Sequence, residues 1–155
     1  MTTGVVSTDV LLAQDGLTFL QGIIDGRFPR PPITDTLGFG LVRVEKGLAA
    51  FEGEPQIRHY NPIGVVHGGF AMTLLDSALG CAVHSTLAKG EAYTTLEIKV
   101  NLVRPLTRDT GPVIAEGRIV YRGRTLGTAE GDIKDRSGKL YAHATTTCMV
   151  FPAKG

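Results

Sequence analysis

The chain has few of the features that would assign it to a class at once. It holds two cysteines in 155 residues, Cys81 and Cys148, which stand far apart and form no CxxC pair. Both lie in apolar runs, so we expect reduced thiols in a cytoplasmic protein. The four histidines show no metal-ligand spacing with cysteines or acids. We therefore expect no bound metal and no resident cofactor.

Neither sign of charge is in marked excess. The formal net charge is +1 and the sequence pI is about 7.8, so the chain has no strong field for nucleic acid or an anionic membrane. The first residues, MTTGVVSTDVLLAQDG, have neither a basic region nor a long apolar run, and we expect no secretory signal. No apolar run is long and uninterrupted enough for a membrane span. Neither nucleic acid nor membrane is an expected partner.

The familiar motifs of several enzyme classes are missing as well. There is no GxSxG, HExxH, GxxxxGK or Rossmann glycine pattern. The length fits one domain that can bury a core without disulfides or metals. Leucines and isoleucines recur at helical spacing in residues 7–25, and the Pro-rich residues 27–32 predict a stop and a loop. Residues 1–36 are thus predicted as an N-terminal helix and loop, followed by the main domain, residues 37–155.

The main domain reads as one long apolar helix among strands. Residues 68–87 predict the helix, and the strand-like runs are residues 37–55 (two strands around a turn), 93–105, 112–122, 125–135 and 139–151. The short connections between the runs predict antiparallel neighbours. A strongly apolar helix must be covered, and a curved antiparallel sheet can wrap it. The expected class is α+β, with a central helix in the concave face of the sheet.

The run at residues 93–105 alternates between apolar and polar side chains. The pattern predicts an apolar face opposite a polar face, made respectively of Leu96, Ile98, Val100 and Leu102 and of Thr95, Glu97, Lys99 and Asn101. On this pattern we expect Thr95 to lie on the polar face of the strand.

The stretch NPIGVVHGGFAMTLLDSALG, residues 61–80, carries the chemistry-bearing residues. Glycines at a helix start allow a ligand to approach free backbone N–H groups, which can bind an oxyanion, or they simply permit tight packing. Asp76 interrupts the apolar helix, and a buried carboxylate is costly unless it is paired. It belongs to a stripe of polar and small residues that faces water, a cleft or a partner subunit: Thr73, Asp76, Ser77, Gly80 and His84.

Helix geometry constrains how the two ends of this stretch could work together. Gly69 and Asp76 are seven residues apart, about 10.5 Å along a helix axis and close to two turns. They share a face, but they cannot both contact one reacting carbonyl within one chain. If both are catalytic, two antiparallel copies of the helix face are needed, which predicts an obligate dimer with two shared sites.

Three stretches together resemble the phenylacetate-degradation (PaaI-like) branch of the hotdog-fold thioesterases: NPIGVVHGGFAMTLLDSALG, TTLEIKVNLVRP and AEGDIKDRSGKLYAHATTT. The pattern Asn-x5-His-Gly-Gly-x6-Asp, followed by a Thr-rich strand ending in Arg-Pro, carries the resemblance over about residues 37–151. It implies the hotdog fold, here with an extra N-terminal helix, and hydrolysis of an acyl-CoA to free acid and coenzyme A.

The resemblance also implies roles for individual residues. Asp76 would act as general base or nucleophile, and the Gly68 backbone N–H of the partner subunit would be the oxyanion donor. His67 would position the thioester carbonyl, and Asn61 would orient the water or the carboxylate. A strand hydroxyl would fall on Thr95, with Thr94 as the alternative by counting forward from Asp76.

Further implications concern the substrate and the assembly. Coenzyme A carries phosphates, so we expect basic residues at the mouth of the site to bind it, and the candidates by type are Arg104, Arg122, Arg124 and Lys139. Gly69 is a further expected contact of the substrate. The resemblance implies a homodimer, usually assembled as a dimer of dimers. Two alternatives stay open: a hotdog enoyl-CoA hydratase or dehydratase, and a non-catalytic acyl-CoA-binding module.

Overall fold

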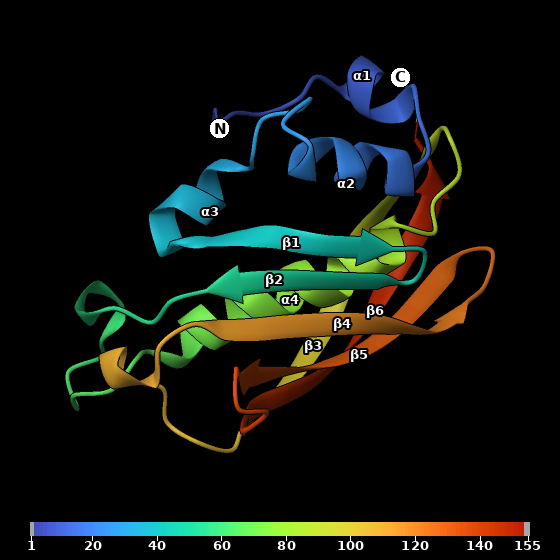
Figure 1. The fold of residues 1–155 in the computed structure, drawn as a ribbon. Coiled ribbons are helices and arrows are strands. Elements are labelled where there is room, and N and C mark those ends of the chain that lie inside the picture. Colours follow the sequence, from blue (N-terminus) through green and yellow to red (C-terminus); the bar gives the residue numbers. More distant parts are fainter. Residues whose placement is uncertain (1, 154–155) are drawn as a thin grey trace.

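A long helix lies in the concave face of a curved antiparallel sheet, as the sequence predicts (Figure 1). The computed structural model describes residues 2–153. Its helices are α1 (Thr8–Leu12), α2 (Gly16–Ile24), α3 (Pro32–Leu37) and α4 (Gly68–His84), with short 3-10 turns at Ile57–His59 and Arg108–Thr110. The strands are β1 (Phe39–Glu45), β2 (Leu48–Gly53), β3 (Glu91–Leu102), β4 (Val113–Arg122), β5 (Leu126–Asp135) and β6 (Leu140–Pro152). No helix within residues 2–153 is long and apolar enough to cross a membrane.

The strand order is β1-β2-β4-β5-β6-β3, and every neighbouring pair is antiparallel. The expectation that short connections join neighbours holds for β4, β5 and β6. It is wrong for β3, which pairs with β6 rather than with β4. The chain crosses over from β3 to β4, so β3 is left as one edge of the sheet and β1 as the other.

A β-bulge in β3 corrects the predicted faces of that strand. The register shifts between Thr95 and Glu97, so that one extra residue, Leu96, stands opposite β6. The bulge puts Thr95 on the same side as Ile98, toward α4, while Leu96 is 55% exposed. The placement of Thr95 on a polar face opposite Ile98 is therefore wrong, because a bulge reverses the alternation on one side of it.

The N-terminal segment is more helical than its sequence suggests. The predicted helix over residues 7–25 is broken into α1 and α2, because Asp15 caps α2 by accepting the backbone N–H of Thr18. The predicted loop contains α3, which begins at Pro32, where proline suits the first turn of a helix. The helix α2 lies over the end of α4, and Gly16 N–H donates to the Leu87 carbonyl.

The helix α4 buries its apolar face against the sheet. Leu74, Leu75, Leu79 and Val83 are completely buried. The predicted stripe of small and polar residues does not stay open along its length. Gly80 is buried against the ring of Tyr93, and the half-buried imidazole of His84 stacks on Phe19 of α2. Only the part of the stripe near Thr73 and Asp76 remains open.

Candidate active site

The start of α4 is shaped by the side chain of His67. This residue is the N-cap, and its Nδ1 accepts the backbone N–H of Gly69 at 2.9 Å. A neutral imidazole that accepts at Nδ1 carries its hydrogen on Nε2, which leaves an exposed N–H donor. Within residues 2–153 the backbone N–H of Gly68 has no acceptor. The helix start therefore offers a free N–H beside an imidazole donor.

The loop before α4 is held by its own polar groups. Asn61 Oδ1 accepts the backbone N–H groups of Ile63 and Val65, at 3.1 and 3.3 Å. The backbone N–H of His67 donates to the His59 carbonyl at 2.7 Å. With its oxygen engaged in this way, Asn61 keeps its amide N–H groups available for a ligand.

These groups border a first hollow of about 260 Å³. Asn61, His67 and Gly68 line it together with Arg104, and so do Leu102 and Tyr141. Sequence reasoning missed the last two residues. For Leu102 the available signal was its position two residues before Arg104 at the end of the strand.

A second hollow of about 420 Å³ lies beside Asp76. Thr95 Oγ1 donates to Asp76 Oδ1 at 3.1 Å, whereas Thr94 is exposed on the other side of β3. Asp76 is itself exposed in the single chain, where its carboxylate borders this open hollow. The half-exposed Met72 and Leu96 add apolar surface beside the carboxylate, and Glu97 adds a second acid to the lining.

One chain thus carries two half-sites on one face of α4. The first half-site is the hollow with Gly68, and the second is the hollow with Asp76. Eight residues of helix, about 12 Å, separate these two residues along the axis. No residue lines both hollows. The structure brings Asn61, His67 and Gly68 together, but it does not bring them to Asp76 within the chain.

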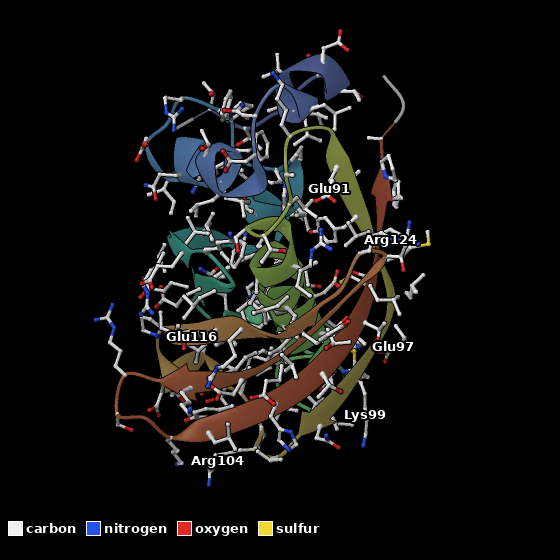
Figure 2. The ribbon with its side chains drawn as sticks, turned by 90° about the vertical axis from the view of Figure 1, so that its right-hand side faces the viewer. Glu91, Glu97, Lys99, Arg104, Glu116 and Arg124 are labelled. Carbon is white, nitrogen blue, oxygen red and sulfur yellow. The ribbon has the colours of Figure 1, made fainter. Side chains whose placement is uncertain are left out.

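The candidate cations lie in three different settings. Arg104 borders the first half-site, where it donates to the Leu140 carbonyl and lies over the Tyr141 ring at 5.7 Å. Arg122 is engaged by Glu91, with 2.8 Å between Nη2 and Oε2. Arg124 is exposed in the β4–β5 turn, and Figure 2 shows it well apart from Arg104.

This face of α4 carries several groups that can take part in chemistry. Within residues 2–153, no group of three or more His, Cys, Asp or Glu side chains is placed to hold a metal ion. Asp76 supplies a carboxylate, Thr95 orients it, and the start of α4 supplies N–H donors and the positive end of a helix dipole. Such a set suits attack on a carbonyl whose oxygen becomes negative.

Comparisons with known proteins show the family to which the chain belongs. The model of the Thioesterase superfamily matches residues 63–142. The 1,4-dihydroxy-2-naphthoyl-CoA hydrolase of Listeria monocytogenes is 27% identical over 118 residues, covering 76% of this chain and 94% of that protein. Acyl-coenzyme A thioesterase 13 of Mus musculus is 28% identical over 104 residues, covering 66% and 71%. A variant of the phenylacetic acid degradation protein PaaI from Thermus thermophilus superposes with a TM-score of 0.68 at 29% identity, covering 76% and 97%. The chain belongs to the thioesterase superfamily and has the hotdog fold of its PaaI-like members.

Proposed function

We propose that the chain is an acyl-CoA thioesterase whose active site forms between two subunits. The observation that carries the proposal is the pair of half-sites on α4: a carboxylate held by Thr95, and a free Gly68 N–H two turns away. Each half lacks what the other holds. A second copy running antiparallel would place Gly68 of the partner subunit near Asp76.

The edge strand β3 supports such a dimer. It pairs with β6 on one side, and within residues 2–153 no strand pairs with its other side. Half-exposed apolar side chains flank this edge: Met72, Leu96 and Leu102. An open edge with apolar neighbours is a natural surface for antiparallel pairing with a second copy. We extend the proposal to a dimer of dimers, as the family resemblance implies.

The proposed reaction needs one base and one oxyanion donor. Asp76 takes a proton from water as the water oxygen bonds to the acyl carbon. Alternatively its carboxylate forms that bond directly, and the mixed anhydride left after the thiolate departs is hydrolysed by water. The carbonyl oxygen gains negative charge opposite the Gly68 N–H, with His67 Nε2–H as a second donor. The carbon–sulfur bond then breaks, and the coenzyme A thiolate takes up a proton. Free acid and coenzyme A are the products.

Coenzyme A would bind along the rim of the first half-site. Arg104 is the strongest candidate for a phosphate contact, because it borders this hollow. Arg122 remains a weaker candidate, since its guanidinium is paired with Glu91. The N–H of Gly69 is engaged by His67, so Gly69 would serve by letting the substrate approach closely. Both cysteines are free thiols, which fits the proposed cytoplasmic location.

Release of free thiol from a panel of acyl-CoAs tests the proposal. The wild-type protein should release coenzyme A, and Asp76→Asn should reduce turnover at least about 1,000-fold while the fold is kept. Asp109→Asn, an exposed acid with 86% of its side chain accessible, is the matched control. Wild-type turnover in Asp76→Asn would contradict the assignment. Addition of water to an enoyl-CoA without thiol release would favour a hydratase, and tight binding without turnover would favour a binding module.

A further inference from the structure

A cavity of about 200 Å³ lies under α2 and shares no lining residue with the hollow of either half-site. Phe19, Leu20 and Ile23 of α2 form one wall, and Cys81 and Tyr93 contribute to the opposite wall. An apolar cavity of about 150 Å³ is large enough to hold benzene. The space under α2 therefore takes a six-membered ring or an alkyl segment of similar size. The residues of α2 precede residues 63–142, the part matched by the superfamily model.

The walls of this cavity hold polar groups without partners. Nε of Arg30 is a buried donor for which residues 2–153 provide no acceptor. The hydroxyl of the half-buried Tyr93, which also lines the cavity, makes no hydrogen bond within the same residues. Buried polar groups are nearly always paired, so the unpaired Arg30 Nε calls for an explanation. An oxygen atom of a ligand in the cavity would give the Arg30 Nε–H an acceptor, and the Tyr93 hydroxyl is a second donor in the same lining.

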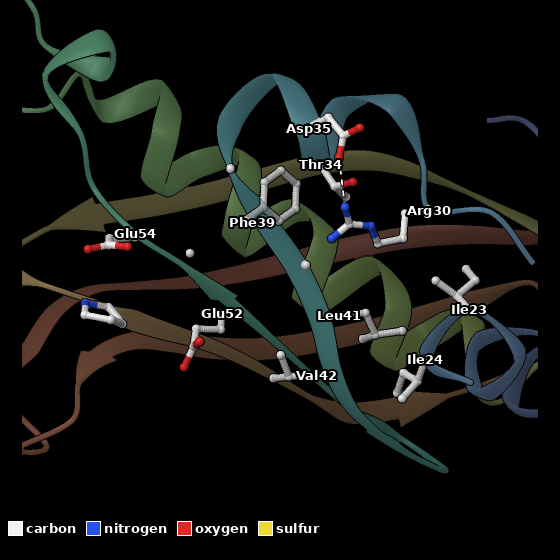
Figure 3. A pocket seen from close by; sticks show the side chains of 14 residues that line it. Ile23, Ile24, Arg30, Thr34, Asp35, Phe39, Leu41, Val42, Glu52 and Glu54 are labelled. Carbon is white, nitrogen blue, oxygen red and sulfur yellow. Dashed lines mark hydrogen bonds and ion pairs between the residues drawn. The ribbon is translucent and has the colours of Figure 1, made fainter. Parts of the chain in front are cut away.

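The position of Arg30 is defined by its neighbours. Its Nη2 donates to Asp35 Oδ1 at 3.1 Å, while the guanidinium reaches between α3 and β1 (Figure 3). The open cleft drawn in Figure 3 adjoins the cavity, and Ile23 and Leu41 line both spaces. The ion pair with Asp35 uses Nη2 and leaves the buried Nε–H without a partner.

The cavity lies next to the second half-site. Tyr93 and Thr95 are two residues apart on the side of β3 that faces α4, a spacing of about 7 Å. The Tyr93 hydroxyl packs against Gly80, one helical turn after Asp76; a Cβ built on that glycine would lie 3.0 Å from the hydroxyl oxygen. The ring of Tyr93 therefore stands between the carboxylate and the space under α2.

We propose that this cavity receives the acyl group of the substrate, and that it favours acyl groups that are apolar but carry an oxygen beyond the thioester. The inference rests on the proposed thioesterase function and deepens it. The thioester carbonyl sits at Asp76, the acyl chain passes Tyr93 as its ring turns aside, and its oxygen accepts from Tyr93 or Arg30. The specificity of this chain is then set largely by α2 and by these two donors.

Two matched substrates, octanoyl-CoA and 8-hydroxyoctanoyl-CoA, test the inference. The measured ratio is kcat/KM for 8-hydroxyoctanoyl-CoA divided by kcat/KM for octanoyl-CoA. For the wild-type protein this ratio should exceed one. Tyr93→Phe and Arg30→Lys each remove one donor, the second while keeping a cation for Asp35. We expect at least one of them to lower the ratio about ten-fold. Tyr121→Phe, on an exposed tyrosine of β4, is the control and should leave the ratio unchanged.

A second variant tests the place of the acyl group without relying on the polar contacts. Cys81→Leu adds bulk at the end of the cavity nearest Asp76 and should shift the preference toward shorter acyl-CoAs about ten-fold. Thermal unfolding checks that each variant folds, and the Tyr93→Phe ratio still decides if Cys81→Leu does not. If acyl-CoAs are hydrolysed but no variant changes the ratio or the length preference, the cavity is not the acyl site. If no acyl-CoA is hydrolysed, the proposed function fails instead.

Discussion

The seating of α4 on the sheet gives a quantitative prediction at Gly117. This glycine of β4 stands directly opposite Gly131 of β5, under the helix. A Cβ on Gly117 would lie 2.5 Å from the Ala78 carbonyl oxygen and 2.7 Å from the Leu79 nitrogen. Real Cβ contacts are essentially never below 3.0 Å, so α4 must lift by at least 0.5 Å (3.0 minus 2.5) in Gly117→Ala.

The loss of unfolding free energy in Gly117→Ala depends on how rigid the contact is. Overpacking costs roughly 1–3 kcal/mol, and the upper end applies because both obstructing atoms belong to the helix backbone. Alanine restricts the unfolded chain more than glycine does, and this effect stabilises the folded state by about 0.4–1 kcal/mol. The net loss of unfolding free energy is about 2 kcal/mol, which lowers Tm by about 4–8 °C for a chain of this length. Asp76 lies two residues before Ala78, so we also expect turnover to fall roughly ten-fold.

Thermal unfolding and thiol release measure the two effects. Gly40→Ala is the matched control, because it is also a strand glycine and its nearest neighbour, Arg30 Nη1, would be 3.8 Å from the new Cβ. The control should unfold at or slightly above the wild-type temperature. An unchanged Tm and unchanged turnover in Gly117→Ala would refute the close seating of α4 on β4.

Three further predictions concern single side chains. Thr95→Val removes the hydrogen bond to Asp76 and should lower kcat about ten-fold with little change in Tm, whereas Thr95→Ser should retain activity; equal rates in the valine variant would count against a role for this bond. Burial lowers the pKa of His84 to about 4 from 6.5, so the folded state loses stability as pH falls from about 6.5 toward 4, by about 2–3 kcal/mol. Urea unfolding at pH 7 and pH 5 should show this loss in the wild type and a smaller loss in His84→Gln, and parallel behaviour of the two would contradict it. Arg104→Ala should raise KM for acyl-CoA several-fold, while Arg122→Ala, which breaks the ion pair with Glu91, should mainly lower Tm; the reverse outcome would exchange their roles.

The elements of the main domain could be predicted because their signals are local. The strands around the Glu-Lys-Gly turn and the run from Gly68 to His84 are set by periodicity and by turn residues. His67, Gly68 and Asp76 could be placed on one helix face because the rise per residue is constant. The constant rise also allowed the distance between Gly68 and Asp76 within one chain to be predicted.

What could not be predicted depends on contacts between distant segments. No local sequence pattern indicates that β3 pairs with β6. The bulge after Thr95 could not be predicted either, because the apolar and polar residues alternate regularly through it. Glu91, which neutralises Arg122, lies 31 residues away in the chain. The cavity beside Tyr93 exists because α2 packs over the end of α4, and no motif in the N-terminal segment indicates that packing.

The central claim, that each active site uses Asp76 of one subunit and the Gly68 N–H of the other, is tested most directly with mixed dimers. Gly68→Pro removes the N–H at the first position of α4, where the backbone suits proline, and His67 already has φ −59° and ψ 136°, which suit a residue before proline. The new Cβ would lie 2.7 Å from Leu102 Cδ1, the end of a flexible side chain that must turn aside. Gly68→Pro and Asp76→Asn should each be inactive alone. Refolded together in equal amounts, they form about half mixed dimers with one intact site of two, which restores about a quarter of wild-type turnover. No recovery above that of the separate variants would show that the two residues do not meet across a subunit interface.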